Sequence, residues 1–233
     1  MYNISRTFIK PEMKLFDLIE ESPMLLLMLQ HFDIDFHVSD LTVARLCKER
    51  GLNENLFISV ANLYNGFKPK VNPIHTAADL KHIVDFLRNS HNYYREDKYP
   101  QISSYIKQLQ KNHPEKELKL IEKFFNDYFA EVIDHLKYEE EVAFPYFIQL
   151  SENKKDPKNK LYSAHEYNEH HTDIELKIKD LKNLLLKYIV INGDLPLRRK
   201  LLFSLFELEY DLYIHSLIEE IILIPFGYNM EKA

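Results

Sequence analysis

The sequence contains few of the residues that tight turns need. Only four of its 233 residues are glycine and none is tryptophan, whereas leucine, isoleucine, lysine and glutamate are abundant. A shortage of glycine together with many helix-forming residues favours long helices over turn-rich β structure. We therefore expect an all-α protein. With 45% hydrophobic and 28% charged residues, the chain is typical of a globular protein with a substantial core.

Other shortages exclude several classes of protein. The one cysteine, Cys47, cannot form an internal disulfide, and the chain does not begin with the basic and then apolar residues of a signal peptide, so we expect a cytoplasmic protein. The net charge of −6 argues against nucleic acid as a partner. The most apolar stretches, 24–29 and 221–225, are too short to cross a bilayer, and we expect no membrane association.

A polar stretch with two prolines, residues 67–75, is the best candidate for a linker. Before it, the sequence predicts a small helical domain over residues 1–68. Helices are expected there at about 14–30, about 40–50 with Ser39 or Asp40 as the N-cap and Gly51 as the stop, and about 53–66 with Asn53 as the N-cap.

After the linker, apolar residues recur at steps of three and four over long segments, which is typical of helices in a bundle. We expect a four-helix up-down bundle over residues 75–228. Its helices are predicted at about 76–98, with a continuation to 111 left open, and at about 115–149, 157–190 and 195–225.

Two of these segments repeat one pattern of metal-ligand residues. His135 is followed by Glu139 and Pro145, and His215 is followed by Glu219 and Pro225 at the same spacing. A histidine and a glutamate four residues apart lie on the same face of a helix, so each pair offers an imidazole nitrogen and a carboxylate oxygen to one point. The two repeats predict a carboxylate-bridged site for two metal ions.

The other two helices carry a histidine on their apolar stripes, at His91 and at His170 or His171. Counting back from Ile174 in steps along the stripe favours His171 as the ligand, with His170 as the alternative ligand or as a residue that orients one. Ionised carboxylates on core stripes are costly to bury unless a cation binds them. A set of imidazoles and carboxylates suits iron or manganese, and we expect iron. The neighbouring Glu140 and Glu141 are expected to face solvent.

These residues resemble the haemerythrin-like di-iron proteins of the iron-sulfur cluster repair group, also called the repair-of-iron-centres family. The resemblance rests on segments 86–91, 135–145, 169–171 and 215–225 and spans residues 75–228. It implies a haemerythrin-like bundle with two non-haem irons joined by a bridging oxo or hydroxo group. The implied terminal ligands are His91, His135, His171 and His215, and the implied bridging ligands are Glu139 and Glu219.

The family resemblance implies repair of iron-sulfur clusters or a response to oxidative or nitrosative stress, with an iron-sulfur client protein as partner. The alternative is a reversible carrier or sensor of oxygen or nitric oxide. The ligand set leaves open whether the protein is an enzyme that reduces nitric oxide or peroxide.

The N-terminal residues also resemble the short domain that precedes the bundle in this family, although His37 and Val38 stand where the family commonly has a Cys-Cys pair. That departure removes any thiol chemistry that the pair would supply.

Overall fold

The regular structure of the chain is helical. The computed structural model describes residues 6–113, 116–152, 162–170 and 175–232, with the backbone alone at 170, 175 and 176. Within these ranges there is no strand, only an isolated antiparallel bridge between Lys14 and Thr42. The prediction of an all-α protein is confirmed. No helix in the same ranges is long and apolar enough to cross a membrane.

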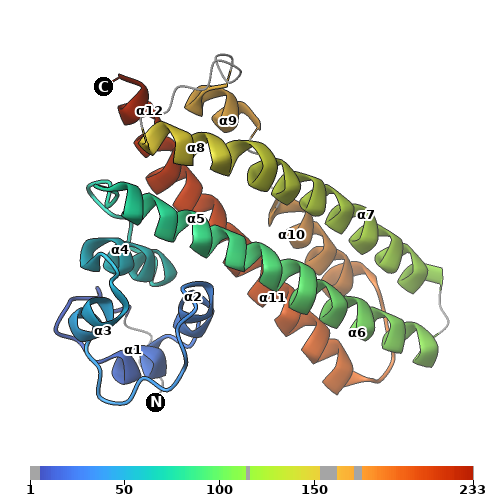
Figure 1. Ribbon diagram of the computed structural model, residues 1–233. Coiled ribbons are helices and arrows are strands. Elements are labelled where there is room, and N and C mark those ends of the chain that lie inside the picture. The colour runs from blue at the N-terminus through green and yellow to red at the C-terminus, as the bar shows by residue number, and fades with distance from the viewer. Residues whose placement is uncertain (1–5, 114–115, 153–161, 171–174, 233) are drawn as a thin grey trace. The chain divides into compact units, whose positions relative to one another are not determined.

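The helices are α-helices with short π-helical segments between some of them (Figure 1). The α-helices are α1 (Leu15–Glu21), α2 (Leu25–His31), α3 (Val43–Arg50), α4 (Glu54–Tyr64), α5 (Ala77–Asn92), α6 (Tyr99–Asn112), α7 (Lys116–Tyr138), α8 (Phe144–Ser151), α9 (Ala164–His170), α10 (Glu175–Asn183), α11 (Leu195–Ile218) and α12 (Ile224–Lys232). The π-helical segments are η1 (Tyr93–Lys98), η2 (Glu139–Ala143), η4 (Leu184–Tyr188) and η5 (Glu219–Leu223).

The predicted helix at 14–30 is wrong as a single helix, because α1 ends at Glu21 and α2 begins at Leu25. Pro23 lies in the gap. Proline has no N–H to donate to the carbonyl four residues earlier, and it disfavours helical backbone at the residue before it.

The caps of the next two helices follow from single side chains. The N-cap of α3 is Thr42, whose hydroxyl accepts from the Arg45 N–H at 3.3 Å, and not Ser39 or Asp40 as predicted. The helix ends at Gly51, whose φ of 65° lies in the left-handed region that glycine adopts without strain. Asn53 caps α4 as predicted.

Each long predicted helix after the linker consists of shorter pieces. The first continues past Pro100 through η1 and α6, as the open alternative allowed, and the second runs through α7, η2 and α8. The fourth runs through α11, η5 and α12. The third is described only as α9, α10 and η4.

Contacts divide the chain into two compact units. Unit 1 consists of Met1–Asn89, Val142–His171 and Ile214–Ala233. In it, α2 packs against α1 and α4, α3 packs against α4, and α12 packs against α8 and α9. The short helices α1 to α4 follow one another closely in Figure 1. The division of the chain near residue 68 and the up-down order of the bundle stay predictions.

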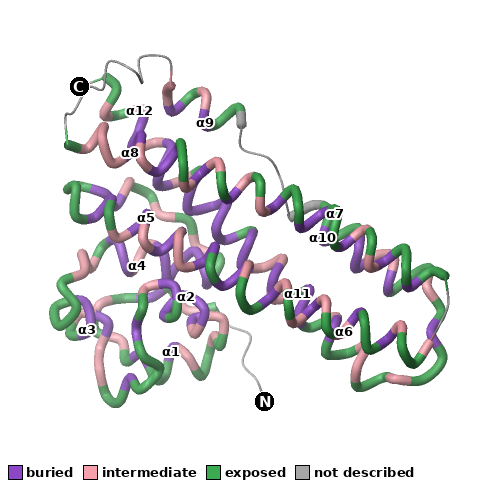
Figure 2. Tube along the Cα trace, turned by 45° about the vertical axis from the view of Figure 1, so that its right-hand side comes forward, coloured by how far each residue is buried: buried purple, intermediate pink, exposed green. Residues whose placement is uncertain are grey.

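Unit 2 consists of Ser90–Glu141 and Thr172–Tyr213, and in it α7 packs against α6 and α10. Its core side chains recur at helical spacing, as the alternation of buried and exposed residues along α6 and α7 shows (Figure 2). The ring of Tyr99 stacks on that of Phe129, with centroids 4.1 Å apart. Burial of these apolar stripes stabilises the helices that carry the polar residues described next.

Candidate metal centre

The candidate ligands lie where α-helices end. His91, His135 and His215 are in the last turns of α5, α7 and α11. Glu139 and Glu219 are the first residues of η2 and η5. Each histidine therefore precedes a π-helical segment, a form that is rare in proteins and frequent at functional sites.

Prolines explain why these segments form. The α-helix after η2 begins Phe144-Pro145, the one after η5 begins Ile224-Pro225, and the one after η1 begins Tyr99-Pro100. A proline inside a continuous α-helix would leave the carbonyl four residues earlier without a donor, whereas in the first turn of a new helix the missing N–H costs little. The proline in each repeated motif thus marks the position where the hydrogen-bond register returns from π to α.

In unit 2, the carboxylate of Glu139 lies between two imidazoles. Its Oε2 is 3.2 Å from Nε2 of His91, and its Oε1 is 2.9 Å from Nε2 of His135. The side chains of Glu139 and His91 are fully buried, and that of His135 is 10% exposed. One oxygen faces each imidazole, which is the arrangement by which a carboxylate bridges two metal ions that each hold one histidine.

In unit 1, the second motif places Nε2 of His215 3.4 Å from Oε1 of Glu219. The hydroxyl of Tyr167 in α9 donates a hydrogen bond to the same Oε1 at 2.5 Å. Glu219 and Tyr167 are fully buried, and His215 is 2% exposed. The tyrosine therefore supplies a donor to a carboxylate that water does not reach.

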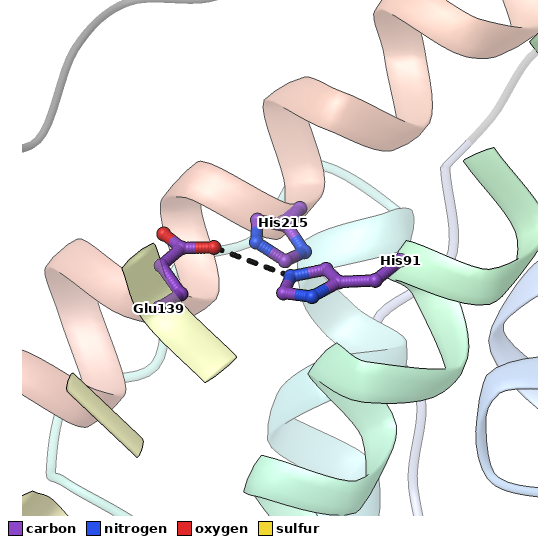
Figure 3. Close-up of side chains that lie close together, drawn as sticks. All are labelled: His91, Glu139 and His215. Carbon is purple, nitrogen blue, oxygen red and sulfur yellow. Dashed lines mark ion pairs between the residues drawn. The ribbon is translucent and has the colours of Figure 1, made fainter. Parts of the chain in front are cut away.

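Two groups of side chains in the described ranges can hold a metal ion. The first is His91, Glu139 and His215, and the second is His135, Glu139 and Glu219. In each group, one ligand atom per residue lies within 4.8 Å of the others. Figure 3 shows the side chains of His91, Glu139 and His215 directed toward one another. Glu139 belongs to both groups, as a bridging ligand would.

The chemistry of these donors fits a cation. An isolated carboxylate in a low-dielectric interior is costly unless it neutralises, pairs or binds a metal. Glu139 and Glu219 are both fully buried, and the oxygens of Glu139 lie 2.9 and 3.2 Å from imidazole nitrogens that can act as ligands. Nitrogen and oxygen donors without thiolate match transition metals such as iron and manganese.

The side chain of Glu140 contacts the imidazole of His91, so the expectation that it faces solvent is wrong. Its Oε1 is 2.8 Å from Nδ1 of His91 and 3.1 Å from a guanidinium nitrogen of Arg95, and its side chain is 28% exposed. The hydrogen bond from His91, together with that from Arg95, lowers the pKa of Glu140 to about 2. Glu141, with a side chain 65% exposed, faces solvent as predicted.

The contact with Glu140 fixes the tautomer of His91. An ionised carboxylate can only accept, so Nδ1 of His91 carries the proton and donates it to Glu140. In the neutral ring, Nε2 then presents its lone pair on the side where Glu139 lies. Histidines that bind metals are commonly oriented by a carboxylate in this way.

A further buried carboxylate, Asp211, lies one turn before His215 on α11 and is 1% exposed. It accepts a hydrogen bond from the hydroxyl of Tyr94 at 2.9 Å. Burial, followed by the charge of Asp211, raises the pKa of Tyr94 well above its usual value. Tyr94 therefore stays protonated and holds the Asp211 carboxylate in place.

The structure places five of the predicted ligands, His91, His135, Glu139, His215 and Glu219, in the two groups above. His171 lies outside the described residues. His170 is the last residue of α9, and the structure describes its backbone alone. The choice between these two histidines stays a prediction.

Sequence reasoning missed Glu140, Tyr167 and Asp211 as partners of the site. Tyr167 and Asp211 each lie four residues before a predicted ligand, His171 and His215, and that spacing on a helix could have indicated them. Glu140 gave no comparable signal, because its position depends on the π-helical register.

No protein-family model matches the chain, and no curated protein matches it.

Proposed function

We propose that the chain holds two iron ions in a carboxylate-bridged centre of haemerythrin type. The proposal rests on Glu139, because its side chain is fully buried and each of its oxygens faces the Nε2 atom of a different histidine. In this proposal Glu139 and Glu219 would hold both ions, and His91, His135, His171 and His215 would each hold one. His171 is proposed as a ligand from its position in the sequence alone.

The surrounding residues would orient these ligands. Glu140 holds the Nδ1 proton of His91 and so directs Nε2 toward the ion, while Tyr167 fixes one oxygen of Glu219. Bound iron would supply ferrous and ferric states and a coordination position for a diatomic molecule. The nearly complete burial of the donors would limit access of water to that position.

For the cellular role, we propose repair of iron-sulfur clusters or a response to oxidative or nitrosative stress. The support is the resemblance of segments 86–91, 135–145, 169–171 and 215–225 to the repair family, together with helical residues before the linker that match the outline of its N-terminal domain. The corresponding partner is a protein that carries an iron-sulfur cluster.

One observation favours the second candidate, a reversible carrier or sensor of oxygen or nitric oxide. The only cysteine, Cys47, is 2% exposed, and burial raises the pKa of its thiol to about 12. Such a thiol is neither ionised nor accessible near neutral pH, so it cannot take part in thiol exchange with a client protein.

Iron content per chain tests the metal proposal. Protein purified without oxygen should contain about two irons per chain, and Glu139→Ala and Glu219→Ala should each lower this number, because a bridging ligand serves both ions. Glu141→Ala is the matched control, since Glu141 is exposed and two residues from Glu139. Unchanged iron in both bridging variants would contradict the proposal.

The visible spectrum separates the two roles. The iron-loaded protein is exposed to oxygen or to nitric oxide, and the gas is then removed. A band that appears and disappears reversibly would favour the carrier or sensor, whereas irreversible oxidation or loss of iron would favour the repair or reductase role.

A further inference from the structure

Helix α11 carries apolar side chains on two faces, roughly 110° apart around the helix axis. One face, with Leu201, Leu205, Leu208 and Leu212, is buried to 1% exposure or less. The other, called the outer stripe here, advances by alternating steps of four and three residues. The outer stripe consists of Leu195, Arg199, Leu202, Phe206, Glu209 and Tyr213.

Four of the six residues of the outer stripe are exposed, and Leu202 and Glu209 are half-buried. Leu195 is 70% exposed, Phe206 46% and Tyr213 45%, and Phe203 beside the stripe is 67% exposed. The first four residues of the stripe line a groove of about 280 Å³ together with Phe203 and Arg198. A helix with a second apolar face toward solvent is typical of one that a partner covers there, and an exposed apolar patch marks an interaction site.

The two charges of the outer stripe indicate what covers it. Arg199 lies four residues after Leu195, and Glu209 lies four residues before Tyr213, so the stripe is symmetric about position 204 except that the charges have opposite signs. Arg199 makes no ion pair within the described ranges. Glu209 is paired with Lys182, and its carboxylate retains sites for a second donor.

We propose that the outer stripe binds the outer stripe of a second copy of this chain, antiparallel and around a two-fold axis near position 204. In that register Leu202 of each copy meets Phe206 of the other, and Arg199 of each meets Glu209 of the other. A two-fold interface repeats each contact, so two apolar pairs at the centre are flanked by two ion pairs. A parallel arrangement would place arginine against arginine and glutamate against glutamate.

The length of the outer stripe indicates how tightly the two copies should bind. The 18 steps from Leu195 to Tyr213 span about 27 Å, and a seam one helix wide over that length buries less than the roughly 800 Å² per partner of a standard interface. The dimer should therefore be weak, with a dissociation constant on the order of 10 µM.

Sedimentation velocity over a concentration series tests the proposal. The wild-type protein should be mostly dimeric at about 100 µM and monomeric at about 1 µM. Phe203→Ser should raise the dissociation constant about tenfold or more, because Phe203 lines the exposed groove next to the central Leu202 and Phe206. The matched control is Leu120→Ser on α7, which removes an equally exposed apolar side chain, 67% exposed, outside the stripe.

The orientation has its own test. Arg199→Glu should weaken the dimer, because it places the new carboxylate of one copy against Glu209 of the other, whereas mixing this variant with Glu209→Arg should restore association through opposite charges. A protein that is monomeric at about 100 µM, or equal effects of Phe203→Ser and Leu120→Ser, would overturn the proposal. So would a monomer that binds a different protein or a lipid vesicle through Phe203. None of these readouts depends on bound metal.

Discussion

Glu140 and Arg95 position one histidine of the candidate centre without touching the proposed ion. Glu140→Ala removes the acceptor of the Nδ1 proton of His91, so the ring can rotate and the tautomer is no longer fixed. We expect metal affinity to fall by roughly 10- to 100-fold while the helical content stays the same. Competition with a chelator of known affinity measures the change.

The control for this prediction is Glu141→Ala, which removes an exposed carboxylate next to Glu140 and should leave the affinity unchanged. Equal affinities for the Glu140→Ala and wild-type proteins would show that packing alone orients His91.

Tyr167 gives a second prediction, for the protein stripped of metal. Tyr167→Phe removes the hydroxyl that donates to the buried Glu219, so the metal-free protein should lose about 1–3 kcal/mol of unfolding free energy. Tyr146→Phe is the control, because it removes the hydrogen bond from Tyr146 to Glu231 at a partly exposed position and should cost about 0.5–1.5 kcal/mol. Urea unfolding of the chelated proteins would measure both losses, and a smaller loss for Tyr167→Phe than for Tyr146→Phe would contradict the expectation.

Single residues also show what a sequence can reveal. Histidine and glutamate four residues apart necessarily share a helix face, which is why the sequence alone was enough to pair His135 with Glu139. The contact between Glu140 and His91 joins residues 49 positions apart. Local spacing carries no information about such a contact, because it depends on how two helices pack.

The same distinction holds for whole elements. Helical periodicity predicted the long helical segments, and Asn53 and Gly51 marked ends that the structure confirms. Periodicity also led to one helix at 14–30, where the apolar steps continue across Pro23 but the backbone cannot. The π-helical segments were not predicted, since their shift of one residue is too small to disturb a pattern counted in threes and fours.

The π-helical segment η2 gives a testable prediction about iron binding. Pro145→Ala restores a backbone N–H and should allow η2 and α8 to join α7 as one α-helix, which turns Glu140 away from His91. Iron content should fall although the thermal unfolding temperature does not.

The matched control for Pro145→Ala is Pro196→Ala, because Pro196 lies in the first turn of α11 and follows no π-helical segment. Iron content should be unaffected in this control. Equal iron content in the Pro145→Ala and wild-type proteins would mean that the π-helical register is not needed for the ligand geometry.

At the scale of the whole molecule, composition was sufficient for the fold class and for little more. Four glycines and repeated apolar stripes leave few alternatives to an all-α chain. The ligand motifs indicated that distant helices converge, and the two groups around Glu139 agree with that. The outer stripe of α11 could not be recognised from the sequence, because only the structure shows which apolar face of a helix the chain itself covers.

The last prediction concerns stability. The candidate ligands come from α5, α7 and α11 and from the π-helical segments that follow α7 and α11, so a bound ion ties together parts of the chain that lie far apart in sequence. Metal that binds only the folded state at about 1,000 times its dissociation constant adds about 4 kcal/mol, which corresponds to a rise of roughly 10 °C in unfolding temperature. Calorimetry of the iron-loaded and chelated wild-type protein should show this rise. In Glu139→Ala the two temperatures should nearly coincide, because the residue shared by both groups is gone. A full rise in that variant would mean that iron stabilises the protein from a different site.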